Sequence, residues 1–189
     1  LQGIILSRRP YKSGQAYKKI WNKERDESPL KTYTRSQCEK IAELFAKDHS
    51  EVLFEWGMRY GNPSTENGMK SLTERGCTKI LFFALYPQYS ACTTATAYDK
   101  VFDVLKTLNY QPSIRTASAW HDDPEYIEIL ADSVRETLNI EDRPDHIVTS
   151  FHGLPKRYLM NGDPYHCFCS KTSRLLREKL SWDEEKWTT

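Results

Sequence analysis

His152 has the residue type and the position best suited to chemistry in this sequence. It follows the apolar run 145–151 and precedes Gly153 and Pro155. If that run is a strand of an open parallel sheet, His152 lies at the carboxyl end, the edge where such sheets bind ligands. An imidazole with an ordinary pKa of about 6.5 can accept a proton or bind a metal ion near neutral pH. The alternative is a structural histidine that fixes the following turn, and position alone does not separate the two.

Two arginine–tyrosine clusters could bind a ligand that carries carboxylates. Arg8 and Arg9 precede a predicted helix that contains Tyr17, and Arg59 is followed directly by Tyr60. A guanidinium binds carboxylates through paired, charge-assisted hydrogen bonds, and a tyrosine adds a hydroxyl donor and a flat apolar ring. The combination suits a large, flat, apolar substrate with carboxylate groups. The alternative is that these arginines are solvated surface residues, and we prefer it for Arg8.

The cysteines indicate reduced thiols in a cytosol-like compartment. Their number is odd, they are scattered, and no signal peptide is visible; they are Cys38, Cys77, Cys92, Cys167 and Cys169. The pair Cys167 and Cys169 lies beside His166 and could bind a soft metal ion. Because structural zinc sites usually have two separated pairs of ligands, we favour ordinary thiols near the start of a helix.

Several classes of function have no sequence signal. The 189 residues contain no Gly-x-Gly-x-x-Gly or Walker loop for a nucleotide and no Gly-x-Ser-x-Gly elbow for a hydrolase. Ser90 and Cys92 follow a predicted strand and could be nucleophiles, but we favour side chains that bond the start of the next helix. With 27 basic and 26 acidic residues the net charge is +1, which argues against nucleic acid as a partner. No run of about twenty apolar residues could span a bilayer.

Apolar, strand-like runs alternate with amphipathic stretches along the chain. The hydrophobic pattern predicts strands over 51–58, 79–86, 111–118 and 145–151, and helices over 13–23, 34–48, 64–75, 94–108, 123–138 and 171–180. We expect Thr34, Ser64 and Asp123 to cap three of the helices, and Gly76 to end one. This order predicts an α/β fold with a doubly wound parallel sheet. The loops 59–63, 86–90 and 152–155 would then meet at the carboxyl ends of the strands.

The polar connector 139–144 predicts a domain boundary. We expect residues 1–142 to form most of a first domain and residues 143–189 to begin a second. The sequence opens on Leu1 rather than methionine and ends at Thr189 without a cap or tail, so we expect that both ends are cut.

Five short segments together resemble signature segments of the ferrochelatase family. They occur in the family's order and at plausible spacing, between about residue 4 and residue 182. They are residues 8–10 with Tyr17, 58–60, 86–90, 150–155 and 162–165. The resemblance is greatest to the bacterial branch. It implies the chelatase fold, in which two similar Rossmann-like, flavodoxin-like domains enclose the porphyrin; here the first domain would be followed by the start of the second.

The resemblance also implies an activity and a set of site residues. A ferrochelatase is a lyase of haem biosynthesis that inserts ferrous iron into protoporphyrin IX and releases two protons. His152 matches the family's histidine that takes a pyrrole proton or ligates the incoming metal. Further matches are Arg9, Tyr17 and Ser28, which would hold propionates; Arg59 and Tyr60, which would lie near the metal route; and Tyr86, which would line the pocket.

The resemblance carries further expectations about this chain. Ferrous iron would be a substrate, and the cysteines that usually hold an iron–sulfur cluster in some relatives would lie beyond residue 189, so we expect no cluster here. An acidic residue that faces the histidine would also lie beyond that point, so we expect residues 1–189 alone to be weakly active or inactive. We expect a cytoplasmic protein, with peripheral contact to the inner membrane and self-association as further options. A tetrapyrrole- or metal-binding module without turnover, or a chelatase for cobalt, is the alternative.

Overall fold

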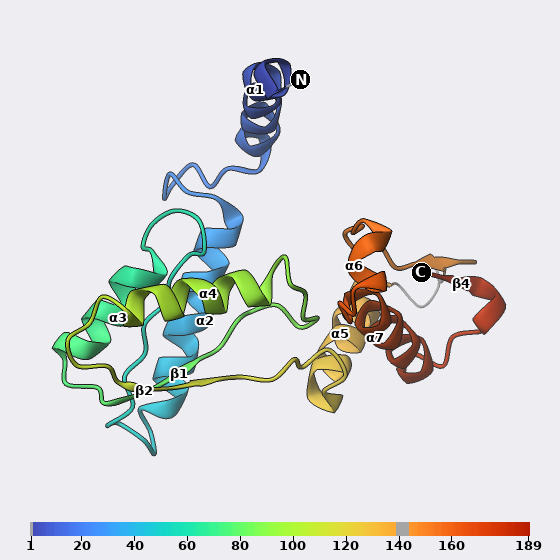
Figure 1. The fold of residues 1–189 in the computed structure, drawn as a ribbon. Coiled ribbons are helices and arrows are strands. Elements are labelled where there is room, and N and C mark those ends of the chain that lie inside the picture. The colour runs from blue at the N-terminus through green and yellow to red at the C-terminus, as the bar shows by residue number, and fades with distance from the viewer. Residues whose placement is uncertain (1, 139–143) are drawn as a thin grey trace. The chain divides into compact units, whose positions relative to one another are not determined.

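The computed structural model describes residues 2–138 and 144–189, with side chains from Pro10 onward. The chain divides into two compact units, Leu1–Thr78 and Lys79–Thr189, and each is considered by itself (Figure 1). The domain boundary expected after residue 142 falls outside the described residues.

The first unit contains the helices α1 (Gln2–Ile20), α2 (Pro29–Phe45) and α3 (Thr65–Glu74). Helix α2 begins five residues earlier than the sequence predicts, because Ser28 rather than Thr34 caps it: the Ser28 Oγ accepts a hydrogen bond from the Lys31 N–H at 3.3 Å. Pro29 then occupies the first helical turn, where its missing N–H costs nothing. Thr34 lies within α2 and donates its hydroxyl to the Leu30 carbonyl.

Helix α3 has the ends that the sequence predicts. Ser64 and Asn67 form a reciprocal capping box, in which each side chain accepts from the other residue's backbone N–H. Gly76 follows the helix with φ +86°, a conformation that side chains with a Cβ rarely adopt. The polar start signal and the glycine stop are both local, which is why they could be predicted.

The strand predicted over 51–58 is wrong. Within the described residues this segment has no strand partner, and only Met58 forms an isolated bridge, in which its N–H donates to the Pro63 carbonyl at 2.7 Å. The apolar side chains pack against helices instead: the Phe54 ring lies 5.2 Å from that of Phe45. Apolar character therefore indicates contact with a helix here, but the backbone hydrogen bonds that define a strand need a second strand.

The second unit opens with a parallel β-α-β arrangement. Strand β1 (Lys79–Phe82) pairs with β2 (Ser113–Thr116), with Ile80 opposite Ile114, and α4 (Thr94–Leu105) connects them. The buried face of α4 contributes core residues to this unit, Ala97, Val101 and Val104. The strands predicted over 79–86 and 111–118 are thus present in shorter form.

Helices α5 (Pro124–Thr137) and α7 (Tyr165–Lys179) pack against each other. Asp123 caps α5 as predicted, accepting hydrogen bonds from the Glu125 and Tyr126 N–H groups. Helix α7 begins six residues before the predicted start at residue 171. Its first turns contain Cys167 and Cys169, which were expected near the start of a helix, and they are held by tertiary contacts such as the stacking of Phe168 on His121, with ring centroids 3.7 Å apart.

The first strand of a second parallel pair precedes the segment 151–155, which contains His152. Strand β3 (Ile147–Val148) pairs with β4 (Trp187–Thr188), and α6 (Lys156–Met160) and the 3₁₀ helix η2 (Glu184–Lys186) complete the unit. The sequence predicted β3 but neither α6 nor β4. The α/β class with parallel strands is confirmed, although the described strands form two separate two-stranded sheets. None of the described helices has the length and apolar character required to cross a bilayer.

Candidate functional site

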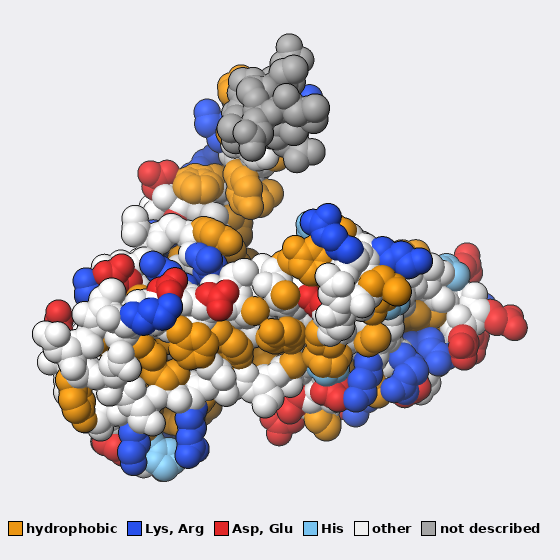
Figure 2. Space-filling view, viewed as in Figure 1, with side chains coloured by type: hydrophobic (Ala, Val, Ile, Leu, Met, Phe, Trp, Pro, Cys, Tyr) orange, Lys and Arg blue, Asp and Glu red, His pale blue; other side chains and the backbone are white. Residues whose placement is uncertain are grey.

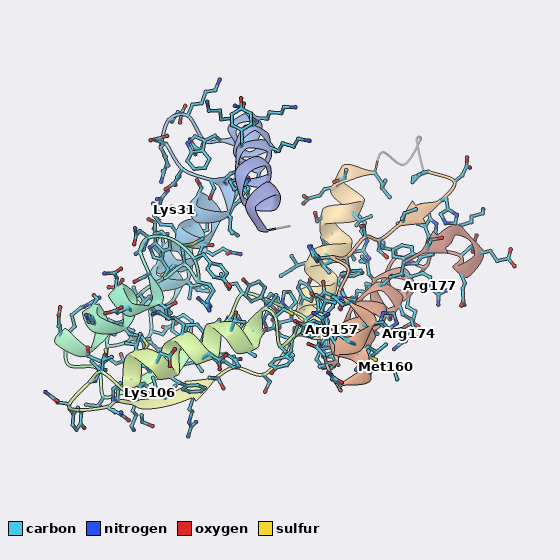
Figure 3. The ribbon with its side chains drawn as sticks, turned by 45° about the horizontal axis from the view of Figure 1, so that its top comes forward. Lys31, Lys106, Arg157, Met160, Arg174 and Arg177 are labelled. Carbon is cyan, nitrogen blue, oxygen red and sulfur yellow. The ribbon has the colours of Figure 1, made fainter. Side chains whose placement is uncertain are left out.

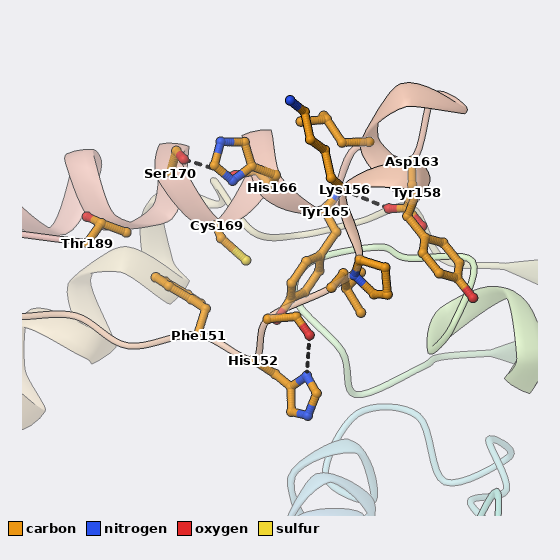
Figure 4. Close-up of a pocket in the computed structure, with 14 residues that line it drawn as sticks. Phe151, His152, Lys156, Tyr158, Asp163, Tyr165, His166, Cys169, Ser170 and Thr189 are labelled. Carbon is orange, nitrogen blue, oxygen red and sulfur yellow. Dashed lines mark hydrogen bonds between the residues drawn. The ribbon is translucent and has the colours of Figure 1, made fainter. Parts of the chain in front are cut away.

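A cavity of about 500 Å³ lies in the second unit where the chain leaves β3 (Figure 4). Its walls come from the segment 151–155, from α6, from the first turns of α7 and from Thr189. The lining residues that carry titratable groups are His152, Lys156, Tyr158, Asp163, Tyr165, His166 and Cys169. The sequence motif around His152 therefore does line a cavity, as its position after a strand predicts.

His152 is held in one tautomer by its own turn. The ring Nδ1 lies 2.9 Å from the carbonyl oxygen of Gly153. Because a carbonyl oxygen only accepts, Nδ1 must carry the proton in this contact. In the neutral imidazole the lone pair then lies on Nε2, which can accept a proton or bind a metal ion. The side chain is solvent-exposed in this unit, so the functional and turn-fixing interpretations of His152 are compatible.

Tyr165 connects the start of α7 to His152. Its hydroxyl contacts the Cys169 thiol and the His152 backbone, and burial together with the thiol raises the pKa of Tyr165 to about 12. The phenol therefore stays protonated at neutral pH. The sequence predicted no role for Tyr165, although the motif 162–165 was part of the family resemblance. That motif was the signal that could have singled out Tyr165, whereas its contact with His152 is visible only in the fold.

The two neighbouring cysteines differ in environment. Cys167 is exposed, whereas Cys169 is buried, and burial raises the pKa of the Cys169 thiol. A raised pKa keeps this thiol neutral and a poor metal ligand. Throughout residues 2–138 and 144–189, no three His, Cys, Asp or Glu side chains lie together in a way that could hold a metal ion.

Tyr86 lies in the loop that follows β1 and is 40% exposed. The same loop contains Ser90, whose hydroxyl is fully buried and accepts a hydrogen bond from the Cys92 N–H at 3.1 Å. Ser90 thus bonds the start of the next helix, as favoured from the sequence, and burial excludes it as a nucleophile. Tyr86 is one of the exposed side chains of this loop that could contact a ligand, together with Phe83 and Leu85.

The first unit has a smaller cavity of about 330 Å³ near the α1–α2 connection. Ser28 and Tyr60 both line it, together with Lys31 at the start of α2 (Figure 3). The Arg59 guanidinium lies over the Tyr60 ring, 4.6 Å from its centroid. The structure thus brings together three of the sequence-predicted residues, Ser28, Arg59 and Tyr60.

A charged network fixes the residue that precedes Ser28. Glu27 is 5% exposed and is held by Arg35 through a forked pair of hydrogen bonds, one of 2.9 Å, and by the Thr32 hydroxyl at 2.9 Å. The hydrogen bond from Arg35 is the main cause that lowers the pKa of Glu27. The network orders the connection at the point where Ser28 caps α2.

The remaining propionate candidates lie on α1. Tyr17 is 54% exposed there, and Arg9 belongs to the same helix, but its side chain lies outside the described part of the chain. His152 and Tyr86 belong to the second unit, whereas the other candidates belong to the first, so their convergence on one ligand stays a prediction.

The basic side chains of α7 are neutralised by acidic neighbours. Figure 2 shows Lys and Arg side chains gathered on the surface of this helix, and Arg174 and Arg177 project from it in Figure 3. Each basic residue has a carboxylate partner: Lys171 with Asp122, Arg174 with Glu178, Arg177 with Glu184, and Lys179 with Glu128. This pairing leaves little unbalanced positive charge on α7, and a nucleic acid needs such charge to bind.

The described parts define an α/β protein with parallel strands and a cavity that His152 lines in the segment after β3. The family model for ferrochelatase matches residues 1–189. The chain is 53% identical over 188 residues to the ferrochelatase of Agrobacterium fabrum, and this alignment covers 99% of the chain and 54% of that relative. It is 51% identical over 187 residues to the ferrochelatase of Allorhizobium ampelinum, with 98% of the chain and 54% of the relative aligned. It is 49% identical over 187 residues to that of Rhizobium meliloti, with 98% of the chain and 55% of the relative aligned.

The chain belongs to the ferrochelatase family. It spans about half the length of the curated relatives that it matches. The family resemblance read from five sequence motifs is thereby confirmed, and so is the chelatase fold that it implied.

Proposed function

We propose that this protein takes part in the last step of haem synthesis, the insertion of ferrous iron into protoporphyrin IX. The observation that carries the proposal is the tautomer of His152: its Nδ1–H is engaged by Gly153, so Nε2 presents a lone pair at the wall of the cavity. Metal insertion must remove two protons from the pyrrole nitrogens, and a neutral imidazole is suited to accept one. Family membership and an identity of about 50% over nearly the whole chain support the same activity.

The other candidate residues bind and orient the substrate in this proposal. Arg9, Tyr17 and Ser28 hold the propionates, where a guanidinium and two hydroxyls supply donors to carboxylate oxygens. Arg59 and Tyr60 lie near the metal route, and Tyr86 offers a flat ring to the macrocycle. The Arg59–Tyr60 stacking and the shared cavity of Ser28 and Tyr60 support the grouping within the first unit.

Ferrous iron is a substrate in this proposal. The alternative role for His152 is to ligate the iron through Nε2, because one lone pair cannot hold a proton and a metal ion at the same time. The macrocycle must bend so that its nitrogen lone pairs point out of the ring plane toward the metal. Strain of a few kcal/mol is within what binding energy from remote groups such as the propionates can supply.

We propose a cytoplasmic location with peripheral membrane contact, because protoporphyrin is poorly soluble in water. Self-association was expected if the strand over 145–151 lacked a partner. Strand β3 has a partner, β4, which weakens this expectation. Val148 nevertheless keeps 67% of its surface exposed. Self-association therefore stays a prediction.

The test replaces His152 by alanine in the full-length protein and measures the rate of iron insertion and, by fluorescence titration, the affinity for protoporphyrin. Loss of a general base typically lowers rates by about 10²–10⁴-fold, and we expect a loss in that range with porphyrin affinity unchanged. His166→Ala is the matched control, since His166 lines the same cavity from α7. A His152→Ala variant with near-normal insertion would exclude the assignment, and a wild-type protein that binds porphyrin without inserting iron would indicate a binding module.

A further inference from the structure

Asp163 joins two loops that lie more than seventy residues apart in sequence. Its Oδ2 accepts hydrogen bonds from the Ser90 hydroxyl at 2.9 Å and from the Ala91 N–H at 2.8 Å. Its Oδ1 accepts from the Tyr165 N–H at 3.0 Å, and Figure 4 shows this bond at the start of α7. One carboxylate therefore connects the loop after β1 to the helix that begins beside the cavity.

The surroundings favour a charged carboxylate at this position. Ala91 shortly precedes α4 and Tyr165 is the first residue of α7, so Asp163 lies at the N-termini of two helices, where negative charge is stabilised. Burial alone would raise the pKa of Asp163, but the hydrogen bonds from Tyr165, Ala91 and Ser90 outweigh it and lower the pKa. Asp163 is therefore ionised throughout the neutral range, and it acts as an acceptor only.

Ser90 is oriented for this contact. Its hydroxyl oxygen accepts from the Cys92 N–H, and the side chain is fully buried. Its single proton is thus directed to Asp163 rather than to solvent. A second bond ties the same loop to α7, because the Gln88 Nε2 donates to the Thr172 Oγ1 at 3.0 Å.

This connection leads at each end to a proposed substrate-facing residue, Tyr86 or His152. The loop held by Ser90 and Gln88 contains Tyr86, and the helix start held by Asp163 contains Tyr165, whose hydroxyl contacts the His152 backbone. The path from Tyr86 to His152 therefore runs through Asp163 and Tyr165, and all of it lies in one compact unit.

We propose that Asp163 is a positioning residue for the reaction: it fixes the Tyr86 loop against the start of α7 and so sets Tyr86 relative to His152. This inference rests on the proposed function. Asp163 acts through its hydrogen bonds to Ser90, Ala91 and Tyr165. Misplacement of a reacting group by about 1 Å can lower a rate on the order of 10²-fold.

The substitution Asp163→Asn tests the role with little change of shape. An amide has one acceptor oxygen, and its NH₂ group would face either the Ala91 N–H or the Tyr165 N–H, donor against donor. We expect kcat for iron insertion to fall about 10-fold or more and KM for protoporphyrin to change by a smaller factor, because Tyr86 is one contact to the macrocycle whereas the proposed propionate-binding residues belong to the first unit. Hydrogen exchange at the Ala91 amide should become faster in the same variant.

The matched control is Asp123→Asn. Asp123 also accepts two backbone N–H bonds at a helix N-terminus in the same unit, but both donors belong to its own helix, α5. We expect it to lose a comparable amount of thermal stability and to keep kcat. If both variants lower kcat equally for the same loss of stability, or if Asp163→Asn raises KM rather than lowering kcat, the positioning role is wrong.

A milder variant covers the case in which Asp163→Asn does not fold. Ser90→Ala removes one of the three donors, and we expect kcat to fall about threefold and the double variant to show less than the product of the two effects. Unchanged kcat in Ser90→Ala would then overturn the inference. A wild-type protein that inserts no iron would instead overturn the proposed function, so the two failures are distinguishable.

Discussion

Ser173 is the residue whose removal should most clearly loosen the strand that leads to His152. It lies on α7 and is 1% exposed. Its Oγ accepts the Trp187 Nε1–H at 2.8 Å and shares hydrogen bonds with the hydroxyls of Thr149 at 2.8 Å and Thr189 at 2.5 Å. Thr149 directly follows β3, and Trp187 begins β4. The Ser173 hydroxyl therefore connects both strands to α7 by hydrogen bonds.

The magnitude follows from which partners can find a substitute. In Ser173→Ala, Thr149 keeps weaker contacts of 3.2 Å with the Thr188 carbonyl and the Thr189 hydroxyl, whereas the part-buried Trp187 N–H loses the acceptor that it has here. An unsatisfied buried donor costs about 1–3 kcal/mol, so we expect a loss of about 2 kcal/mol. That corresponds to an opening equilibrium roughly 30-fold larger.

The assay is hydrogen exchange at the Thr149 amide in the full-length protein. This N–H donates to the Thr188 carbonyl at 2.8 Å and reports the β3–β4 pairing directly. Its exchange should be roughly 30-fold faster in Ser173→Ala if the strands open locally. Ser170→Ala is the control, because Ser170 is exposed on the same helix and donates only to the carbonyl of His166 within that helix; its effect should stay within about 0.5 kcal/mol. Equal exchange rates in the two variants would refute the reasoning.

Two further variants test the ligand and the stability of the fold. Arg9→Leu in the full-length protein should weaken protoporphyrin binding by about 1.5–3 kcal/mol, and the loss should shrink for a porphyrin with esterified propionates; equal losses in fluorescence titrations would make Arg9 structural. His121 is buried, and neither ring nitrogen has a hydrogen-bond partner among the described residues. Burial lowers the pKa of His121, and the charge of Lys171 lowers it further; only Asp122, at 3.7 Å, acts in the opposite direction. The unfolded chain therefore binds the proton more tightly, so stability is lost as pH falls below about 6.5. His121→Phe should remove that loss and add about 1–2 kcal/mol, and urea unfolding that shows the same dependence between pH 5 and 7 in both proteins would contradict it.

Helix ends could be predicted because their signals are local. Ser64 with Asn67, Gly76, and Asp123 before Pro124 all act within four residues of the helix end that they fix. The misplaced start of α2 is of the same kind. Ser28 followed by Pro29 is a stronger start signal than Thr34, because proline suits the first turn and cannot lie further inside.

Strands were harder, since a strand is defined by its partner. The runs 51–58 and 79–86 are both rich in apolar residues, yet within the described structure only the second contains a strand, β1, which pairs with β2. The partner of β3 is β4, two residues at the end of a charged stretch with no strand pattern. Its identity depends on contacts such as Trp187 with Ser173 on α7, and no periodicity within residues 184–189 indicates them.

In the candidate site, too, the sequence motifs indicate single residues, whereas contacts between distant residues are visible only in the fold. The motifs around His152, Tyr86 and Asp163 were each visible in the sequence, and the turn chemistry of His152 with Gly153 involves adjacent residues. The bond between Asp163 and Ser90 spans 73 residues, and no local rule connects a carboxylate before one helix with a hydroxyl before another. Yet that bond determines whether the loop of Tyr86 and the strand end of His152 belong to one rigid arrangement. The motifs 86–90 and 162–165, which are separate in the sequence, are therefore one structural unit. A substitution in either motif should change the position of residues in both.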